Sequence, residues 1–179
     1  MSLLLLLGLL VLPLQSIHAE TIVRSGDAVS IAANQTVEGN YYGVGGTVSL
    51  SGSVTGDAIL AGGNITINGM VAEDVFALGG TVNISASTSD DVRIIGGDVT
   101  ISGPVGGSLI VLGGRVTVLS SATIVGDVLV YGGDVTIDGA VQGSILGTIE
   151  RLRVNGQVGG GLSVTTSYLS LIHISEPTR

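Results

Sequence analysis

Residues 96–112 read Gly-Gly-Asp-Val-Thr-Ile-Ser-Gly-Pro-Val-Gly-Gly-Ser-Leu-Ile-Val-Leu, and this stretch decides the fold. Apolar and polar residues alternate within it, which is the two-residue period of a half-buried β-strand. Glycines interrupt the alternation every few residues, where they favour turns. An α-helix is excluded, because repeated glycines within one helix would each lower its stability. The stretch therefore predicts short strands separated by tight turns.

The same pattern recurs along the chain, and its most regular marker is a pair of adjacent glycines. The first members of these pairs are Gly45, Gly62, Gly79, Gly96, Gly113 and Gly132. Four steps of 17 residues are thus followed by one step of 19. A fixed period this short is typical of a solenoid. Partial repeats precede and follow the pairs, which gives about eight turns. The two additional residues of the 19-residue step lie within residues 119–123, where we expect a loop at a corner.

Stacking the turns converts sequence positions into columns of inward-facing apolar residues. One such column reads Val48, Ile65, Val82, Val99, Val116, Val135 and Leu152. Each turn offers three strand-like segments, so the expected fold is all-β: a single three-sided β-helix of about eight turns. One turn buries five or six aliphatic side chains, and each of them stabilises the fold by roughly 2 kcal/mol. Ordering the chain costs roughly 1.5 kcal/mol for every residue of the turn, so a single turn loses more than it gains. Stability must therefore come from stacking.

Composition and charge exclude several classes of protein. Glycine makes up 30 of 179 residues while 45% of residues are still hydrophobic, which excludes a disordered chain, and no strict Gly-x-y repeat is present. The net charge is −8 and the chain has no Lys, so nothing could form a basic footprint for nucleic acid. Absence of Cys excludes disulfides and thiolate metal sites.

The two ends of the chain differ from the repeats. Residues 3–14 are almost entirely apolar and Ala19 is a small residue suited to cleavage, so residues 1–19 are interpreted as a secretory signal peptide. An exported protein is therefore expected. Residues 169–179 do not continue the pattern and resemble a translated sequencing adapter, so they are interpreted as foreign. The repeat domain is assigned to residues 20–168.

Stacked carboxylates are the only candidates for metal or acid–base chemistry. Asp57, Asp74, Asp91 and Asp127 share one column, interrupted by Ser108 and Ser144. Repulsion between carboxylates about 4.8 Å apart in water is only roughly 0.9 kcal/mol, so no ion is required between them. We expect these side chains to accept hydrogen bonds from local backbone N–H groups in turns. Residues 20–168 also contain no His or Lys to serve as a base, so we expect no catalytic residue, no metal and no cofactor.

One side of the expected coil breaks the alternation, because the outward positions there are apolar too. Its first outward column contains Ile59, Phe76, Ile110, Leu129 and Leu146, interrupted by Arg93. Beside it lie Ala61, Leu78, Ile95, Leu112 and Tyr131. Such a stripe is larger than a soluble monomer usually exposes. We interpret it as a self-association surface, with Ile59, Phe76, Ile110, Leu129 and Tyr131 as its candidate residues; coverage by a further C-terminal segment is the alternative.

In its Gly-Asp-Val and Val-Thr-Ile-x-Gly repeats the chain resembles the bactofilins, the polymer-forming cytoskeletal proteins of bacteria. Examples are residues 98–103 and residues 126–128, and the resemblance extends over about residues 26–165. It implies a right-handed β-helix that assembles end to end without nucleotide. Typical bactofilins are cytoplasmic, whereas the signal peptide makes this chain similar to exported bactofilin-like proteins in which membrane helices follow the solenoid.

The sequence thus predicts a non-enzymatic, self-assembling scaffold of the bacterial cell envelope. Its expected partners are further copies of the chain, in a homo-polymer, together with a membrane or the cell wall through a segment beyond residue 168. The alternative is a monomeric adhesin or glycan-binding stalk that would use Tyr41, Tyr42 and the faces rich in Ser and Thr. An enzyme acting on envelope polysaccharides is disfavoured because the repeat domain lacks a basic residue suited to proton transfer.

Overall fold

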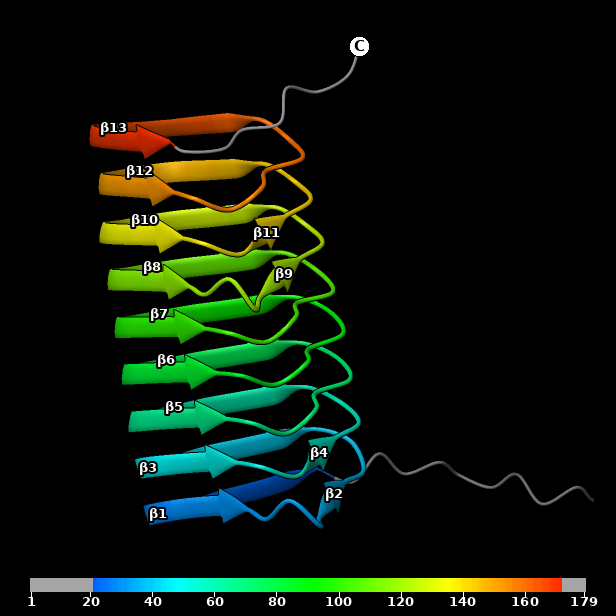
Figure 1. The fold of residues 1–179 in the computed structure, drawn as a ribbon. Coiled ribbons are helices and arrows are strands. Elements are labelled where there is room, and N and C mark those ends of the chain that lie inside the picture. The colour runs from blue at the N-terminus through cyan, green and yellow to red at the C-terminus, as the bar shows by residue number, and fades with distance from the viewer. Residues whose placement is uncertain (1–20, 172–179) are drawn as a thin grey trace, which may run out of the picture.

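The computed structural model describes residues 21–171, and these residues fold as a β-solenoid (Figure 1). Nine long strands stack in parallel in one sheet, each beside the next long strand of the chain. They are β1 (Ile22–Ile31), β3 (Tyr41–Leu50), β5 (Ala58–Ile67), β6 (Val75–Ile84), β7 (Val92–Ile101), β8 (Leu109–Val118), β10 (Val128–Ile137), β12 (Ile145–Val154) and β13 (Leu162–Leu171). The all-β solenoid expected from the repeats is confirmed.

Pairing between the long strands repeats the sequence period. Val92 of β7 lies opposite Leu109 of β8, 17 residues further along the chain. The offset becomes 19 where β8 meets β10, so that Leu109 lies opposite Val128. Side chains of equal sequence position therefore stand in columns along the axis of the solenoid.

Each long strand forms two of the three sides. The pairing is interrupted at the second glycine of each Gly pair, as at Gly97, so this residue marks the corner between the two sides. The third side consists of isolated bridges such as Val71 to Thr88, and of four short strands. These are β2 (Thr36–Val37), β4 (Ser53–Val54), β9 (Thr123–Ile124) and β11 (Ala140–Val141). The structure thus joins two of the three predicted strand segments into one bent strand.

The core is a set of apolar ladders inside the coil. Every member of the predicted column from Val48 to Leu152 is at most 2% exposed. Thr88 is the one buried polar residue of the described range, and it stands between Val71 and Val105 in the column of the third side. No helix long and apolar enough to cross a membrane occurs among residues 21–171.

The solenoid has nine turns, and the expectation of about eight was one too low. The additional turn ends in β13, which has Thr166 and Ser167 where other turns carry the Gly pair. A turn without the glycines can still stack: β12 also lacks the pair, and there Gly147 adopts a φ of 143° while Ile149 becomes buried. Gly pairs mark six turns, and the partial repeats added two more but not the turn of β13, whose last residues 169–171 fall in the segment interpreted as foreign.

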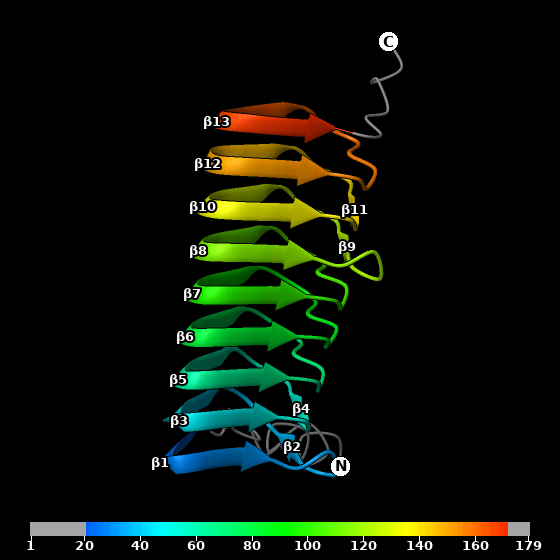
Figure 2. The same ribbon diagram turned by 60° about the vertical axis from the view of Figure 1, so that its left-hand side comes forward.

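The two additional residues of the 19-residue step form a loop, as expected. Between β8 and β9 the chain turns at residues 119–122, where the Ala122 N–H donates to the carbonyl of Leu119 over 2.9 Å. Figure 2 shows this loop projecting from the stack beyond the connections of the neighbouring turns.

The two end segments are only partly described. The signal peptide predicted for residues 1–19 lies outside the described residues. Residues 169–171 end β13, where Leu169 lies opposite Leu152 and Leu171 opposite Val154. Residues 172–179 lie outside the described range, so the adapter-like segment is described only at its start.

Candidate functional site: an apolar face beside a charged column

One outer side of the solenoid is apolar over successive turns. It comprises the second and fourth residues of the long strands, which point outward because the first and third point into the core. We call this surface the apolar face; its members are Ile59, Ala61, Phe76, Leu78, Ile95, Ile110, Leu112, Leu129, Tyr131 and Leu146. The structure thus brings all five predicted self-association residues to one side of the coil.

The two columns of the apolar face differ in exposure. Of the five predicted residues, Phe76 and Tyr131 are exposed, whereas Ile59, Ile110 and Leu129 are half-buried between neighbouring turns. In the second column Leu78, Ile95, Leu112 and Tyr131 are 42% to 52% exposed. The column beside the Gly pairs is therefore the more accessible one, and of its members only Tyr131 was among the predicted residues.

An open groove of about 890 Å³ runs beside this second column. Its wall is formed by the column from Ala61 to Thr148, and its floor by the Gly pairs of successive turns. The floor is low because glycine has no side chain, and the backbones are close: a Cβ atom on Gly97 would stand 2.8 Å from the carbonyl oxygen of Gly80. The Gly pairs thus allow tight stacking at the corner and also hollow the surface.

Beyond the glycine floor, four successive turns carry charges of alternating sign. These residues, which we call the charged column, are Asp98, Arg115, Asp134 and Arg151. Arg115 Nη1 lies 3.0 Å from Asp98 Oδ1, and Arg151 Nη2 lies 2.8 Å from Asp134 Oδ2. Hydrogen bonding to Arg151 lowers the pKa of Asp134, and Arg151 in turn has a raised pKa chiefly through Asp134. Spacing alone could have indicated this column, which the sequence predictions did not include.

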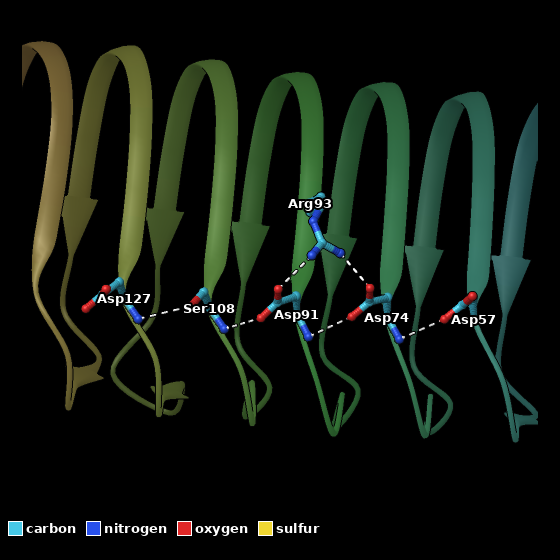
Figure 3. A network of polar contacts seen from close by, with 6 residues as sticks. All are labelled: Asp57, Asp74, Asp91, Arg93, Ser108 and Asp127. Atoms are coloured by element: carbon cyan, nitrogen blue, oxygen red, sulfur yellow. Dashed lines mark hydrogen bonds and ion pairs between the residues drawn. The ribbon is translucent and has the colours of Figure 1, made fainter.

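Arg93, which interrupts the apolar face, forms ion pairs with two carboxylates. Its Nη1 atom lies 2.6 Å from Asp74 Oδ2 and its Nη2 atom 2.7 Å from Asp91 Oδ2 (Figure 3). The hydrogen bond to Asp74 is the main cause of the raised pKa of Arg93. Sequence reasoning missed this role, although Arg93 follows Asp91 by two residues on the same outward side.

The Asp and Ser column is a ladder of hydrogen bonds between turns. Asp91 Oδ1 accepts from the Ser108 N–H over 2.7 Å, and Asp74 Oδ1 accepts from the Asp91 N–H over 3.1 Å (Figure 3). The same contact continues at Asp127, whose Oδ1 accepts from Ser144. These side chains bind backbone N–H groups as expected, but the donor belongs to the next turn and not to the local turn.

The acidic residues beside Arg93 have a structural explanation. Carboxylate oxygens of Asp74, Asp90 and Asp91 lie within 4.8 Å of one another, a spacing that could hold a metal ion. Arg93 already supplies positive charge to Asp74 and Asp91. One guanidinium offsets one of the three negative charges, and Asp90 is exposed to water.

The aromatic residues of the alternative binding-stalk interpretation are poorly placed. Tyr41 is completely buried, its hydroxyl has no hydrogen-bond partner, and burial raises its pKa. Tyr42 is half-buried. Tyr41 therefore cannot stack on a sugar ring at the surface, and that part of the alternative is wrong. The residue occupies the first inward position of β3, so its side chain packs in the core.

The fold and this surface define the chain as a β-solenoid with an apolar outer side. Comparisons of the chain with protein-family profiles, with curated proteins and with solved structures find no match.

Proposed function

We propose that the chain is a non-enzymatic, self-assembling scaffold of the bacterial cell envelope, similar to the bactofilins. The observation that carries the proposal is the apolar face, which extends along several turns of a rod and leaves its second column about half exposed. An apolar surface of this length favours association with another surface. In an exported protein that association would take place outside the cytoplasm.

The pairing register supports end-to-end growth of such a scaffold. Every long strand presents the same parallel pairing pattern to the next, with equal positions in columns. The edge of a parallel ladder carries unpaired N–H and C=O groups, which can pair with a strand of another molecule. A turn of a second copy would therefore continue the ladder with the register that the chain already uses internally.

Electron microscopy of the purified chain tests the proposal. We expect narrow, regular filaments at micromolar concentration in ordinary salt, and their sedimentation as large particles. A protein that stays monomeric across this range, with its β-structure confirmed by circular dichroism, would contradict the scaffold. Specific binding of such a monomer to a glycan array would favour the binding-stalk alternative in its place.

A further inference from the structure

We propose that a shallow hollow on the second side of the coil binds a sugar acid, meaning a sugar unit that bears a carboxylate. The second side consists of the halves of the long strands that follow the corner glycine. The hollow has a volume of about 130 Å³, and its polar and aromatic lining consists of Asp134, Thr136, Arg151, Arg153 and Tyr168. These residues belong to β10, β12 and β13, at the carboxyl-terminal end of the rod (Figure 1). The site goes beyond the proposed scaffold, because it does not depend on assembly.

The repeat changes character where the hollow lies. In β3, β5 and β6 the outward residues of the second side are only Thr, Ser and Asn. In β12 they are Arg151 and Arg153, and in β13 the first of them is Tyr168. The strands with short side chains stack in the same register, so stacking does not require the larger ones. Local departures from a regular pattern are typical of binding sites.

Arg153 supplies the charge for an anionic ligand. It is exposed, and within residues 21–171 no ion pair or hydrogen bond occupies its guanidinium. The other arginines of that range each have an oxygen partner. A guanidinium presents paired N–H donors whose geometry matches the two oxygens of a carboxylate. Arg153 can therefore bind a carboxylate of a ligand without giving up a contact within the chain.

Asp134 and Thr136 supply acceptors for sugar hydroxyls. Arg151 holds Asp134 from the next turn through Nε and through Nη2, which lies 2.8 Å from Oδ2. The hydrogen bond from Arg151 also lowers the pKa of Asp134, so this carboxylate stays ionised. Its remaining lone pairs can accept from an O–H group of a ligand. Thr136 lies opposite Arg153 on the neighbouring strand and adds a hydroxyl that can donate or accept.

Tyr168 supplies a face on which a sugar ring can lie. It stands opposite Arg151 in the next turn, and 59% of it is exposed. A tyrosine ring offers an apolar face to the C–H groups of a sugar and a hydroxyl at its edge. Outward side chains stay accessible when turns stack, as Tyr131 demonstrates between β8 and β12.

The surrounding charges favour a sugar acid over other anions. The carboxylates of Asp134 and Glu150 already contact Arg151. A ligand with one negative charge can pair with Arg153. A phosphate monoester or an acidic peptide would bring further negative charge close to these two carboxylates, which would repel it. An acidic peptide would also leave the acceptors for sugar hydroxyls unused.

The size of the hollow predicts weak binding of a single sugar unit. Cavities that enclose drug-sized ligands measure about 300–1,000 Å³, so the smaller hollow accommodates one ring against an open surface. The dissociation constant expected for so small a ligand is about 1 mM. Copies joined in a filament would contact one polysaccharide at many points and hold it far more tightly.

Saturation-transfer NMR of the full chain tests the site. The probe is methyl glucuronide, and its matched control is methyl glucoside, in which a hydroxymethyl group replaces the carboxylate. We expect the glucoside to bind at least about tenfold more weakly. The glucoside phosphorylated at the same carbon, and a triglutamate peptide, should also bind more weakly than the glucuronide. Added salt should weaken the binding of the glucuronide.

Two pairs of variants assign the binding to the hollow. Arg153→Gln should weaken binding of the glucuronide about tenfold, whereas Arg115→Gln, an exposed arginine outside the hollow, should leave it unchanged. Tyr168→Ser should weaken it as well, whereas Tyr131→Ser, on the first side, should not. All four residues point outward, and circular dichroism establishes that each variant folds.

The outcomes separate this site from the scaffold. Equal binding of glucuronide and glucoside, or equal losses in Arg153→Gln and Arg115→Gln, would overturn the site. Tighter binding of triglutamate, unaffected by Tyr168→Ser, would identify an acidic peptide as the ligand and would overturn the sugar proposal. Filaments that bind no glucuronide would overturn this inference while the scaffold stands. A chain that binds glucuronide but forms no filaments would contradict the scaffold alone.

Discussion

The two sides formed by each long strand differ only on the outside. In β7 the inward residues of the first side are Val92 and Ile94, those of the second side are Val99 and Ile101, and all four are buried. The outward residue Ile95 of the first side is apolar and exposed, whereas Thr100 of the second side is polar. The same contrast holds in most turns.

This difference shows which apolar positions the fold itself requires and which it does not. Inward positions on both sides must be apolar because they fill one continuous core. Outward positions are not needed for stacking, as the polar outward residues of the second side demonstrate. The apolar character of the first side is therefore not required for stacking, and a contact made by this side would account for it. Substitutions on the two sides can test that explanation.

The largest effect is expected at an inward position. Val48 is fully buried, so Val48→Asp would place an unpaired carboxylate in the core at a cost of about 4 kcal/mol or more, comparable with the whole stability of many domains. We expect loss of the β-sheet signal in circular dichroism. The neighbouring outward variant Ser49→Asp should keep that signal; equal unfolding by both variants would erase the distinction between inward and outward positions.

A smaller destabilisation is expected at the corner between the two sides. The Cβ atom of Gly97→Ala would stand 2.8 Å from the carbonyl of Gly80, so the stacked backbones would have to shift, at about 1–3 kcal/mol. Thermal unfolding measures this as a lower melting temperature. Gly161→Ala is the control, because nothing lies within 4 Å of its Cβ position. A corner that tolerated alanine would mean that the glycines are not required for close stacking.

The third side offers a stabilising substitution. The hydroxyl of Thr88 is buried without a hydrogen-bond partner between Val71 and Val105. Thr88→Val removes this unpaired group and should raise the free energy of unfolding by about 1 kcal/mol. Chemical denaturation measures the gain. Thr100→Val, at an outward position, should change stability by less than about 0.5 kcal/mol, and a Thr88→Val protein no more stable than the natural chain would refute the prediction.

The smallest effect is expected in the charged column. Arg151 holds the pKa of Asp134 below its ordinary value of 3.8, so the pair stabilises the folded chain above that pH and this contribution is lost as the pH falls through the lowered pKa. Asp134→Asn should therefore lower the melting temperature slightly near neutral pH, with the difference vanishing in acid. Because both side chains are at the surface, added salt should shrink the difference too. A difference independent of pH would exclude the ion pair as its cause.

Most of the fold could be predicted from the sequence because one physical pattern repeats. The alternation around Val99 and the recurring Gly pairs required stacked strands, and the 19-residue step located the loop after β8. The ninth turn was missed because residues 169–171, which end β13, fall in the segment interpreted as foreign, and because Thr166 and Ser167 give no Gly pair to mark it. Gly147 shows that another backbone geometry can replace the pair in β12.

The surface could be predicted only in part. Period alone placed Phe76 and Tyr131 outward on one side, since every second residue of a strand shares a face. It could not show that Ile59 and Leu129 would be half covered by neighbouring turns, nor that Arg93 would reach Asp74 across one turn. Those facts depend on side-chain rotamers and on the distance between turns, which the sequence pattern does not contain.

The ladder of Asp and Ser side chains has a direction, and this bears on how the chain folds. Each side chain accepts from the backbone N–H of the following turn, as Asp74 does from Asp91 and Asp91 from Ser108. A folded turn thus holds an acceptor in place before the next turn arrives. A polypeptide that emerges with its amino terminus first would therefore add turns in sequence, because each new turn finds its hydrogen-bond acceptor on the turn before it.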